Sequence, residues 1–525
     1  MKRLLSLSLS MVALSALAQH TYTNAQLTST SDVIGTARYV GMGGALGALG
    51  ADMSAISSNP ASIGLYRKND VSLTAGGLWP SNRAFNEAYG NSAHGTFDQM
   101  GFVTSWSLDG GNMRRFNFAF NYQKKFNHNA AFYADNANLG GISQADQIAD
   151  LSNNYFVEEN ITGTAYNAYV TDKDDLGYYN SHSANSNEFT HYSTGSTQAF
   201  DINFSGNVLD QYYWGVTLGI DNVDYDKMTT YTEFRDGKDG SIQDYTLYND
   251  QHVSGFGVNL KVGTVIRPIE DNPLRFGFTV ETPTWYDMKS SVYHSIDSRY
   301  DKDGNYQQYN YVNHSGMDDS YLEYKLRSPW RVRLSAGSTV ENFLAWGLEY
   351  EYANYTQLRQ SYPNDDYYGY GGSLSGSTKD VAMNDLTKQN MRAQHTFKMG
   401  FEVKPTSNFA IRVGYNYSSS IFKDVARLNQ NIDSYAMDFS TSTDYMNLSD
   451  VSIITGGLGY KYKRFYADLA YKYRIQSGKF YAFDDSFTGT SQFIQDNPNL
   501  ANMTLQPVDV NLNRHSITCT LGFKF

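Results

Sequence analysis

The sequence holds a single cysteine, Cys519, in 525 residues, which excludes an intrachain disulfide framework. Beyond the N-terminal segment there is no run of about 18 apolar residues, so a transmembrane helix is excluded. Positive charge is also scarce, because 41 Lys and Arg stand against 53 Asp and Glu, for a net charge of -12. Nucleic acid is therefore not an expected partner, since binding to its phosphates needs a basic face.

The motifs of common enzymes are absent as well. The chain has neither a G-x-S-x-G nucleophile elbow nor an H-E-x-x-H zinc motif, and its 10 His are scattered. The glycine-rich residues 44–50 lack the spacing and the flanking elements of a dinucleotide fingerprint. The acidic stretches 236–240 and 301–305 lack the distal glutamate of a calcium loop, so ordinary turns are favoured. We therefore expect no enzyme activity, no cofactor and no metal site.

The N-terminus has the three parts of a secretory signal peptide. Lys2 and Arg3 precede an apolar stretch over residues 4–17, which ends in an A-x-A pattern at Ala18. This stretch of roughly 14 residues is too short to span a bilayer as a helix. A buried N-terminal helix is the alternative. We expect export and removal of residues 1–18, with Gln19 as the new N-terminus.

Aromatic residues are abundant: 43 Tyr, 29 Phe and 6 Trp make up 15% of the chain, although the mean hydropathy is only -0.50. Many lie in segments where apolar and polar residues alternate, such as 116–122, 397–404 and the C-terminal 515–525. Alternation with a period of two predicts strands with one apolar and one polar face. A soluble sandwich would bury the apolar face, whereas a transmembrane barrel turns it toward lipid and keeps a polar lumen.

Connection lengths favour the barrel. Short turns such as 109–112 and 405–408 alternate with long connections such as 126–197 and 354–393, and soluble domains rarely hold so many long loops. The sequence predicts an all-β fold, a transmembrane antiparallel β-barrel of about 14 strands over residues 70–525, with short periplasmic turns and long extracellular loops. We place the strands at 70–79, 97–108, 115–125, 198–208, 211–223, 252–267, 273–283, 327–340, 342–353, 394–404, 408–418, 451–463, 465–475 and 514–525, and a short helix near 143–151.

Residues 19–69 are too long for a simple lead-in to the first strand. They contain Gly43 and Gly44 in a glycine-rich run, then Asp52, and they close with Asn59-Pro60-Ala61 directly before the barrel. Small residues permit close backbone packing, and Pro60 restricts both its own φ and the conformation of Asn59. An isolated Asn-Pro-Ala would be an ordinary turn. In this position, within a segment too polar and glycine-rich to lie in lipid, the motif is predicted to pack inside the wide lumen.

The order of these motifs before a barrel resembles the FadL/TodX family of long-chain fatty acid and hydrocarbon transporters. Residues 282–285 and 328–332 are also similar to family stretches around the central strands. The resemblance implies a fourteen-stranded barrel with an internal N-terminal hatch that contains the Asn-Pro-Ala motif. It also implies passive uptake of a hydrophobic small molecule of fatty-acid type, with no cofactor and no energy source.

Several cations on alternating strands are expected to face the lumen. They could bind the carboxylate of a ligand, or they could pair with lumen acids and with the hatch, which is the expectation we favour for any single residue. The candidate ligand-binding residues are Arg275, Arg331, Arg333, Lys398 and Arg412.

The final strand ends on Phe525, and an aromatic end resembles the signal that barrel-assembly machinery recognises. We expect a monomer in the bacterial outer membrane, in contact with outer-membrane lipid. The functional alternative is a barrel that binds at the surface or belongs to a secretion system without transporting, because some family relatives receive secreted proteins or carry haem-receptor labels.

Overall fold

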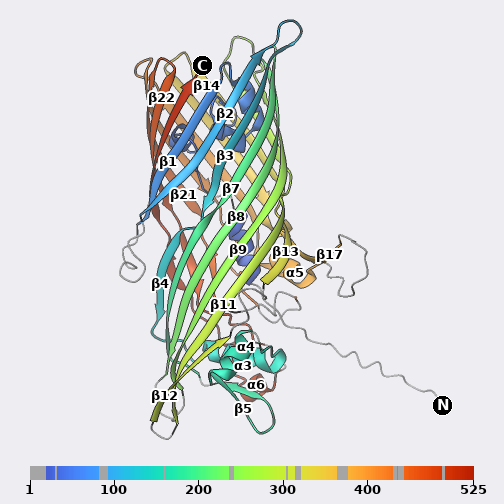
Figure 1. Cartoon of the computed structure of the whole chain (residues 1–525), viewed down its shortest axis with the longest axis vertical. Coiled ribbons are helices and arrows are strands. Elements are labelled where there is room, and N and C mark those ends of the chain that lie inside the picture. Colours follow the sequence, from blue (N-terminus) through green and yellow to red (C-terminus); the bar gives the residue numbers. More distant parts are fainter. Residues whose placement is uncertain are drawn as a thin grey trace, which may run out of the picture.

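The computed structural model shows an elongated barrel that continues at one end into a long, one-sided extension (Figure 1). It describes residues 19–29, 32–81, 93–158, 160–181, 183–235, 242–302, 305–313, 321–363, 376–429, 434, 441, 443–487 and 491–525. The predicted signal peptide, residues 1–18, lies outside the described residues.

Fourteen antiparallel strands close the barrel, as the alternation predicted. Each strand pairs with the next, and the last pairs with the first in the register Asp70↔Lys524. In order around the barrel they are β1 (Asp70–Pro80), β2 (His94–Ser107), β3 (Met113–Asn127), β7 (Ser186–Val208), β8 (Tyr212–Phe234), β9 (Ile242–Ile266), β10 (Arg275–Glu281), β14 (Arg331–Val340), β15 (Leu344–Asn354), β18 (Ala393–Val403), β19 (Phe409–Ser418), β21 (Val451–Tyr462), β22 (Phe465–Ile475) and β25 (Arg514–Lys524). The short connections and the C-terminus share one end, here called the turn end, and the opposite end is called the loop end (Figure 1).

The outward face of the barrel carries a belt of exposed apolar side chains. Along β14 these are Trp330 just before the strand, then Leu334 and Val340, with the exposed Phe343 in the following turn. From Trp330 to Val340 the strand rises about 25 Å along the barrel axis, if each residue adds about 3.3 Å and the strand is tilted by about 40° from that axis. That height matches the hydrocarbon band of a transmembrane barrel. The inward face is polar, which explains a low mean hydropathy in a protein that contacts lipid.

Four strands at the loop end extend far beyond this belt. β7, β8 and β9 have 23, 23 and 25 residues, and β11 (Trp285–Lys302) continues the line of β10. The strands predicted at 198–208, 211–223 and 252–267 are therefore too short, because residues 186–197, 224–234 and 242–251, which the sequence predicts as parts of long connections, continue them as β-structure. Strand alternation continues there, but the apolar side chains change face, because the extension is surrounded by water and has a buried core.

Prolines interrupt two neighbouring strands at the same level. Thr282-Pro283-Thr284 separates β10 from β11, and Ser328-Pro329-Trp330 separates β13 (Tyr321–Arg327) from β14. Proline cannot donate to the ladder, and side chains replace some of the missing hydrogen bonds. The Ser328 Oγ accepts from the Thr284 amide at 2.8 Å, so the wall stays closed here.

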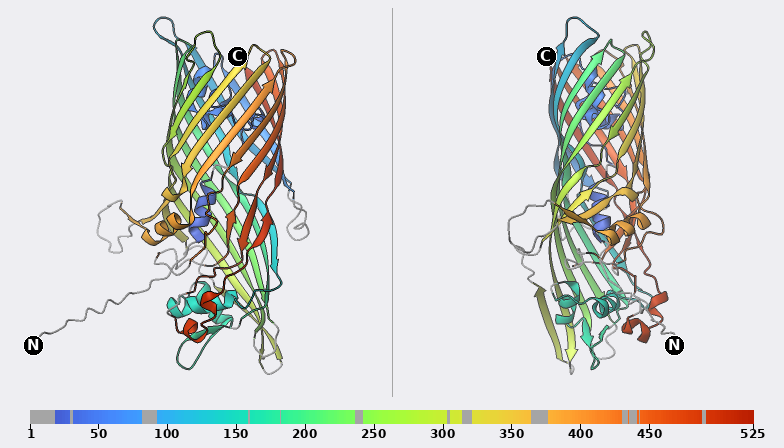
Figure 2. Two further views of the ribbon diagram at one scale, coloured as in Figure 1. Left: turned by 180° about the vertical axis from the view of Figure 1, so that it is seen from behind. Right: turned by 90° about the vertical axis from the view of Figure 1, so that its right-hand side faces the viewer.

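The remaining elements pack at the loop end, mostly against the concave face of the extension (Figure 2). The predicted short helix is confirmed as α3 (Gln144–Asn154), with Ser143 as its N-cap. Among the described residues, no helix is long and apolar enough to cross a membrane. The other elements are β4 (Ala130–Asn136), α4 (Ile161–Asn167), β5 (Thr171–Lys173), β6 (Tyr179–Ser181), β12 (Asn305–Asn313), η3 (Tyr355–Gln357), β16 (Arg359–Pro363), β17 (Ser377–Lys379), α5 (Val381–Asn390), β20 (Tyr445–Leu448), β23 (Ser477–Tyr481), α6 (Gln492–Asp496), η5 (Leu500–Asn502) and β24 (Val508–Asn511).

The N-terminal segment runs along the inside of the barrel, from the loop end toward the turn end (Figure 2). It consists of short helical turns joined by glycine-rich bends: α1 (Gln19–Leu27), α2 (Ala37–Gly41), η1 (Met53–Ser57) and η2 (Pro60–Leu65). Its residues from 33 to 66 are almost all buried. They contact strands on several sides of the barrel, including β8, β19, β21 and β22.

Candidate functional site

Asn59 joins the N-terminal segment to the barrel wall. Its Oδ1 accepts from the Ala61 amide at 2.9 Å and so caps η2, while Pro60 occupies the first position of that helix. Its Nδ2 donates to the Thr264 carbonyl of β9 at 3.0 Å. The Asn-Pro-Ala motif thus uses one side chain to shape a turn and to hold it against the lumen.

Wall glycines make room for this motif. A Cβ on Gly263 would lie 2.1 Å from the Asn59 Oδ1, and a Cβ on Gly215 would lie 2.4 Å from the Pro60 carbonyl carbon. The glycines of the segment itself serve the same purpose. Gly43 has φ +62°, and its Cβ would lie 2.8 Å from the Tyr415 amide nitrogen, so the bend at Gly43 and Gly44 (φ +82°) approaches the wall backbone closely.

Asp52 connects two turns of the segment. Its carboxylate caps η1 by accepting from the Ser54 amide at 2.9 Å, and it accepts from the Thr36 hydroxyl at 2.7 Å. Thr36 is itself the N-cap of α2, through the Tyr39 amide. These contacts make residues 36–58 one folded unit in the lumen. Whether that unit acts as a hatch that opens stays a prediction.

The five predicted ligand-binding cations are all engaged with other groups. Arg333 lies 2.7 Å from Glu281 and 2.6 Å from Glu351, and Arg331 shares the same two carboxylates at 3.6 and 3.7 Å. Lys398 pairs with Glu349 at 2.7 Å. Arg412 pairs with Glu402 at 2.7 Å and with Asp468 at 2.6 Å. Arg275 contacts the N-terminal segment, because it donates to the Leu49 carbonyl at 3.1 Å. Ligand binding by these residues stays a prediction, and the geometry assigns them contacts within the lumen.

Two residues of the segment, Arg38 and Asp32, complete this lumen network and were not singled out from the sequence. Arg38 pairs with Glu402 at 3.0 Å, and Asp32 pairs with Lys472 at 2.6 Å and Arg514 at 2.8 Å. Their signal in the sequence is weak, because an isolated charge in a glycine-rich stretch gives no periodicity.

A cavity of about 140 Å³ opens at the loop end, directly beyond the segment, and is here called the loop-end cavity. Its lining mixes polar and apolar side chains, and α1, β3, β4, β20 and β23 all contribute to it. The apolar side chains include Phe126, Phe132, Tyr445, Met446 and Phe480. A hydrophobic ligand would therefore find an apolar surface before it reached the charged lumen.

Arg474 is the cation that stands out in this lining. Its side chain is only 3% exposed, its Nε has no hydrogen-bond partner, and no carboxylate of the described residues forms an ion pair with it. Its guanidinium carbon lies 5.6 Å from the centre of the Phe126 ring. The neighbouring Arg514 differs because it forms an ion pair with Asp32, although Asp32 is shared with Lys472 and its single negative charge does not neutralise both cations. A buried cation without an anion is unfavourable, so the cavity is suited to an anionic group.

The other charged groups of the cavity are satisfied or neutral. Lys227 forms an ion pair with Asp444 at 2.9 Å. Burial lowers the pKa of His191 to about 3, so this side chain is neutral near pH 7, and its ring stacks on Phe132 with centroids 4.7 Å apart. Arg474 is thus the cation of the lining that has no ion-pair partner among the described residues.

Two further spaces lie near the turn end. A polar cavity of about 310 Å³, here called the turn-end cavity, is lined by Arg38, Asp52, Glu402 and Tyr466 among others. On the lipid-facing side, an apolar groove of about 530 Å³ runs over β1, β22 and β25. Tyr460 and Tyr466 line both spaces, and the Tyr466 ring packs over Gly522, where a Cβ would lie 2.0 Å from its Cζ.

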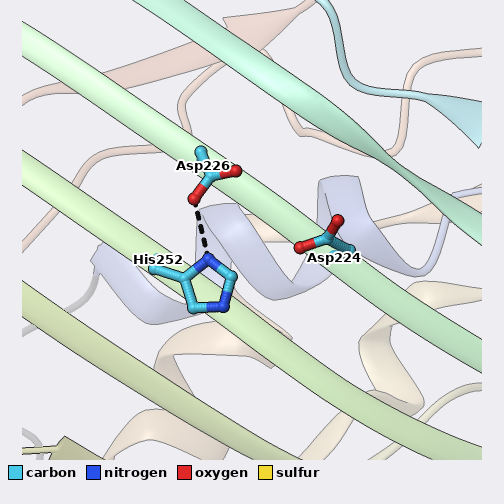
Figure 3. Close-up of side chains that lie close together, drawn as sticks. All are labelled: Asp224, Asp226 and His252. Atoms are coloured by element: carbon cyan, nitrogen blue, oxygen red, sulfur yellow. Dashed lines mark hydrogen bonds and ion pairs between the residues drawn. The ribbon is translucent and has the colours of Figure 1, made fainter.

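Asp224, Asp226 and His252 lie together on the outward face of β8 and β9 (Figure 3). The His252 Nδ1 is 2.7 Å from the Asp226 Oδ1. All three side chains are exposed, and exposed acidic groups of this kind commonly occur without a metal. We assign no metal site to them.

Neither a protein-family model nor a curated protein sequence matches this chain. Solved structures do match. A FadL homologue from Pseudomonas aeruginosa has a TM-score of 0.52 and 12% identity, over 95% of this chain and 100% of that one. The chain has the fold of the FadL-type channels. This confirms the resemblance inferred from the sequence at the level of fold, and with it the predicted fourteen-stranded barrel.

Two toluene transporters are also similar to this FadL-type barrel. TbuX of Ralstonia pickettii has a TM-score of 0.46 and 12% identity, over 94% of this chain and 99% of its own. TodX of P. putida has a TM-score of 0.47 and 11% identity, with the same coverage. These neighbours are transport proteins and not enzymes.

Proposed function

We propose that this FadL-type barrel is a passive channel for hydrophobic small molecules, and that its substrates are amphiphiles with an anionic head, such as long-chain fatty acids. The observation that carries the proposal is Arg474, a buried cation without an ion-pair partner among the described residues, in a loop-end cavity that also presents apolar side chains. An apolar cavity with a few placed polar groups is the usual form of a small-molecule site.

Capture would occur at the loop-end cavity. The acyl chain would bury apolar surface against Phe126 and its neighbours, and each methylene removed from water contributes about 0.8 kcal/mol. The carboxylate would form a charge-assisted hydrogen bond with the Arg474 guanidinium. Arg514 adds to the attraction, because its partner Asp32 is shared with Lys472 and carries a single negative charge.

Passage would require the N-terminal segment to move. Residues 36–58 and the ion pairs around Glu402 and Arg333 fill the lumen between the two cavities. The segment contacts the wall through hydrogen bonds such as Asn59 to Thr264, through ion pairs such as Arg38 to Glu402, and through three small apolar clusters rather than one large apolar core. We therefore assign it the role of a plug that shifts to let a ligand pass.

Release would be sideways into the bilayer. A hydrophobic solute leaving a polar mouth into water is unfavourable, whereas the apolar groove over β1, β22 and β25 offers a path along lipid. Tyr460 and Tyr466 stand between the turn-end cavity and this groove. They are the side chains that a departing ligand would have to pass.

The test is uptake by cells that display the protein and lack other channels for the solute. Labelled long-chain fatty acid should enter several times faster than in cells with an empty vector. The rate should fall when Asn59 and Pro60 are replaced by Ala, although the barrel still assembles. Uptake equal to the empty vector, with normal amounts of assembled barrel, would instead favour the non-transporting surface or secretion role.

A further inference from the structure

The outward face of β11, β13 and β16 carries a group of cations just beyond the apolar belt. In the sheet register Trp285 pairs with Arg327, and Arg327 pairs with Arg359 on the next strand. Directly opposite residues of antiparallel strands point to the same face, with Cα atoms about 4.5–5.5 Å apart. The two arginines therefore stand side by side on the outer surface.

Such a like-charge pair is unfavourable on its own. Among the described residues Arg327 is exposed and forms no ion pair with a carboxylate. The Nη1 of Arg359 donates to the carbonyls of Thr356 and Leu358, both at 2.7 Å, which fixes the guanidinium near its own backbone. Partial burial and the charge of Arg327 lower the pKa of Arg359. Asp385 acts on Arg359 in the opposite direction, but it already forms an ion pair with Lys388 at 2.7 Å, so an excess of positive charge remains.

Neighbouring residues do not cancel this charge. On the same outward face Lys289 lies opposite Glu323, and Lys325 lies opposite Asp287. The row of Lys325 continues through Ser361 to the exposed Lys379, which adds a further cation. The Nζ of Lys289 lies 3.4 Å from the centre of the Tyr321 ring. The excess is therefore largest in the row of Arg327 and Arg359 and continues in the row that ends at Lys379, on a chain whose overall net charge is -12.

The height of this row identifies its surroundings. Trp285 and Trp330 are 55% and 50% exposed and lie at the loop-end edge of the apolar belt. Exposed tryptophans of this kind sit at the level of lipid headgroups. Arg327 follows that edge directly, so its guanidinium is at the depth of the headgroup phosphates.

We propose that Arg327 and Arg359 form a binding site for the phosphate of a lipid headgroup in the leaflet at the loop end. The planar guanidinium matches two phosphate oxygens with two parallel hydrogen bonds. Trp285 and Trp330 contact the apolar part of the same lipid. An anion between the two arginines removes their mutual repulsion, which gives a reason for placing them opposite each other.

The experiment measures lipid binding to the purified full-length barrel in a neutral detergent by native mass spectrometry. The probes are bisphosphorylated lipid A and the same lipid after removal of both phosphates, which differ only in the group in question. The test variant is Arg327→Gln with Arg359→Gln. The matched control is Lys463→Gln with Arg464→Gln, two exposed cations in a short connection at the turn end.

Wild type and control should bind the phosphorylated lipid about tenfold more tightly than the dephosphorylated lipid, since hydrogen bonds to charged groups contribute about 1.5–3 kcal/mol. The double arginine variant should lose this preference while keeping heat-resistant barrel migration on gels. An excess of inorganic phosphate should not displace the lipid. The proposal fails if the arginine variant keeps the full preference, if the control loses it equally, or if inorganic phosphate alone displaces the lipid.

Discussion

The strand β8 passes through two regions, the apolar belt and the extension, and its apolar side chains lie on opposite faces of the strand in the two regions. Within the belt, Leu218 and Ile220 point outward and are exposed, while Thr217 and Asp221 point inward and are buried. In the extension the period of two continues, but now the buried inward side chains include Tyr225 and Tyr231, and outward positions include Asp226. The apolar side chains change face near residues 221–223.

The same change occurs on the neighbouring strands. On β9 the outward Phe256 and Val258 give way to the inward Val253 and Leu247. These inward side chains join the hydrophobic cluster that includes residues of α3 and α4. The comparison teaches that lipid sets the apolar face in one region and a water-excluded core sets it in the other. The level at which the face changes therefore marks the membrane boundary.

The largest expected effect comes from truncating the core of the extension. Tyr231→Ala should lower the free energy of local unfolding there by about 3–5 kcal/mol, because a buried aromatic ring is lost and a cavity remains. Hydrogen exchange of residues in α3 and β8 measures this. Tyr248→Ala is the matched control. Tyr248 is an exposed residue of β9 that pairs with Thr230 of β8 in the sheet register. Equal effects of both variants would mean that the cluster is not a folded core.

The second largest effect is expected when a positive charge is introduced on the outward face of the belt, compared with the same change on the outward face of the extension. Leu218→Arg places a cation in the lipid belt and should cost about 2–4 kcal/mol, whereas Met228→Arg on the same face of the same strand should cost close to nothing. Chemical unfolding from lipid vesicles, followed by tryptophan fluorescence, gives both values. A similar cost at the two positions would move the membrane boundary away from residues 221–223.

The lumen side of the belt can be probed through Asn59. Asn59→Ala leaves the Ala61 amide without its cap and the Thr264 carbonyl without its donor, at a cost of about 1–3 kcal/mol. The barrel should assemble normally, and the conductance of single channels in planar bilayers should become larger or noisier. Conductance and uptake identical to wild type would show that residues 19–69 are not a plug.

The smallest effect concerns pH and the extension alone. Burial raises the pKa of Glu233 to about 7, and its Oε1 accepts from the Gln144 amide at the start of α3. Because the pKa of Glu233 is higher in the folded protein than in the unfolded chain, the contribution of this side chain to stability is complete below pH 4.5. It is lost as the pH rises through about 7. Protection of α3 against hydrogen exchange should fall over that range in wild type but not in Glu233→Gln. Parallel pH profiles for the two proteins would remove Glu233 as the cause.

Much of the barrel could be predicted from sequence because lipid imposes a strict pattern. The positions of the fourteen strands within the belt agree with the structure to within a few residues at most ends, as for predicted 394–404 and observed Ala393–Val403. The extension could not be recognised, since its alternation continues that of the belt while the apolar side chains, among them Val253 and Leu247, change face, and the sequence alone does not show which face is inward. The lumen cations were identified as a group, but their pairing depends on Arg38, Asp32 and distant acids that meet only in the fold.

The candidate site was harder to predict for a related reason. Arg474 is one of several cations on alternating strands, and nothing in its local sequence separates it from Lys472, which pairs with Asp32. Only the three-dimensional arrangement shows that one carboxylate serves Lys472 and Arg514 and leaves Arg474 unpaired.

The central claim is that Arg474 binds the anionic head of a hydrophobic ligand, and titration calorimetry of the purified barrel tests it most directly. Wild type should bind a long-chain fatty acid about tenfold or more tightly than the corresponding methyl ester, because the ester cannot accept a charge-assisted hydrogen bond in the same way. Arg474→Gln should bind acid and ester with similar affinity, and Lys463→Gln should behave as wild type. An Arg474→Gln barrel that still prefers the acid as strongly as wild type would contradict the claim.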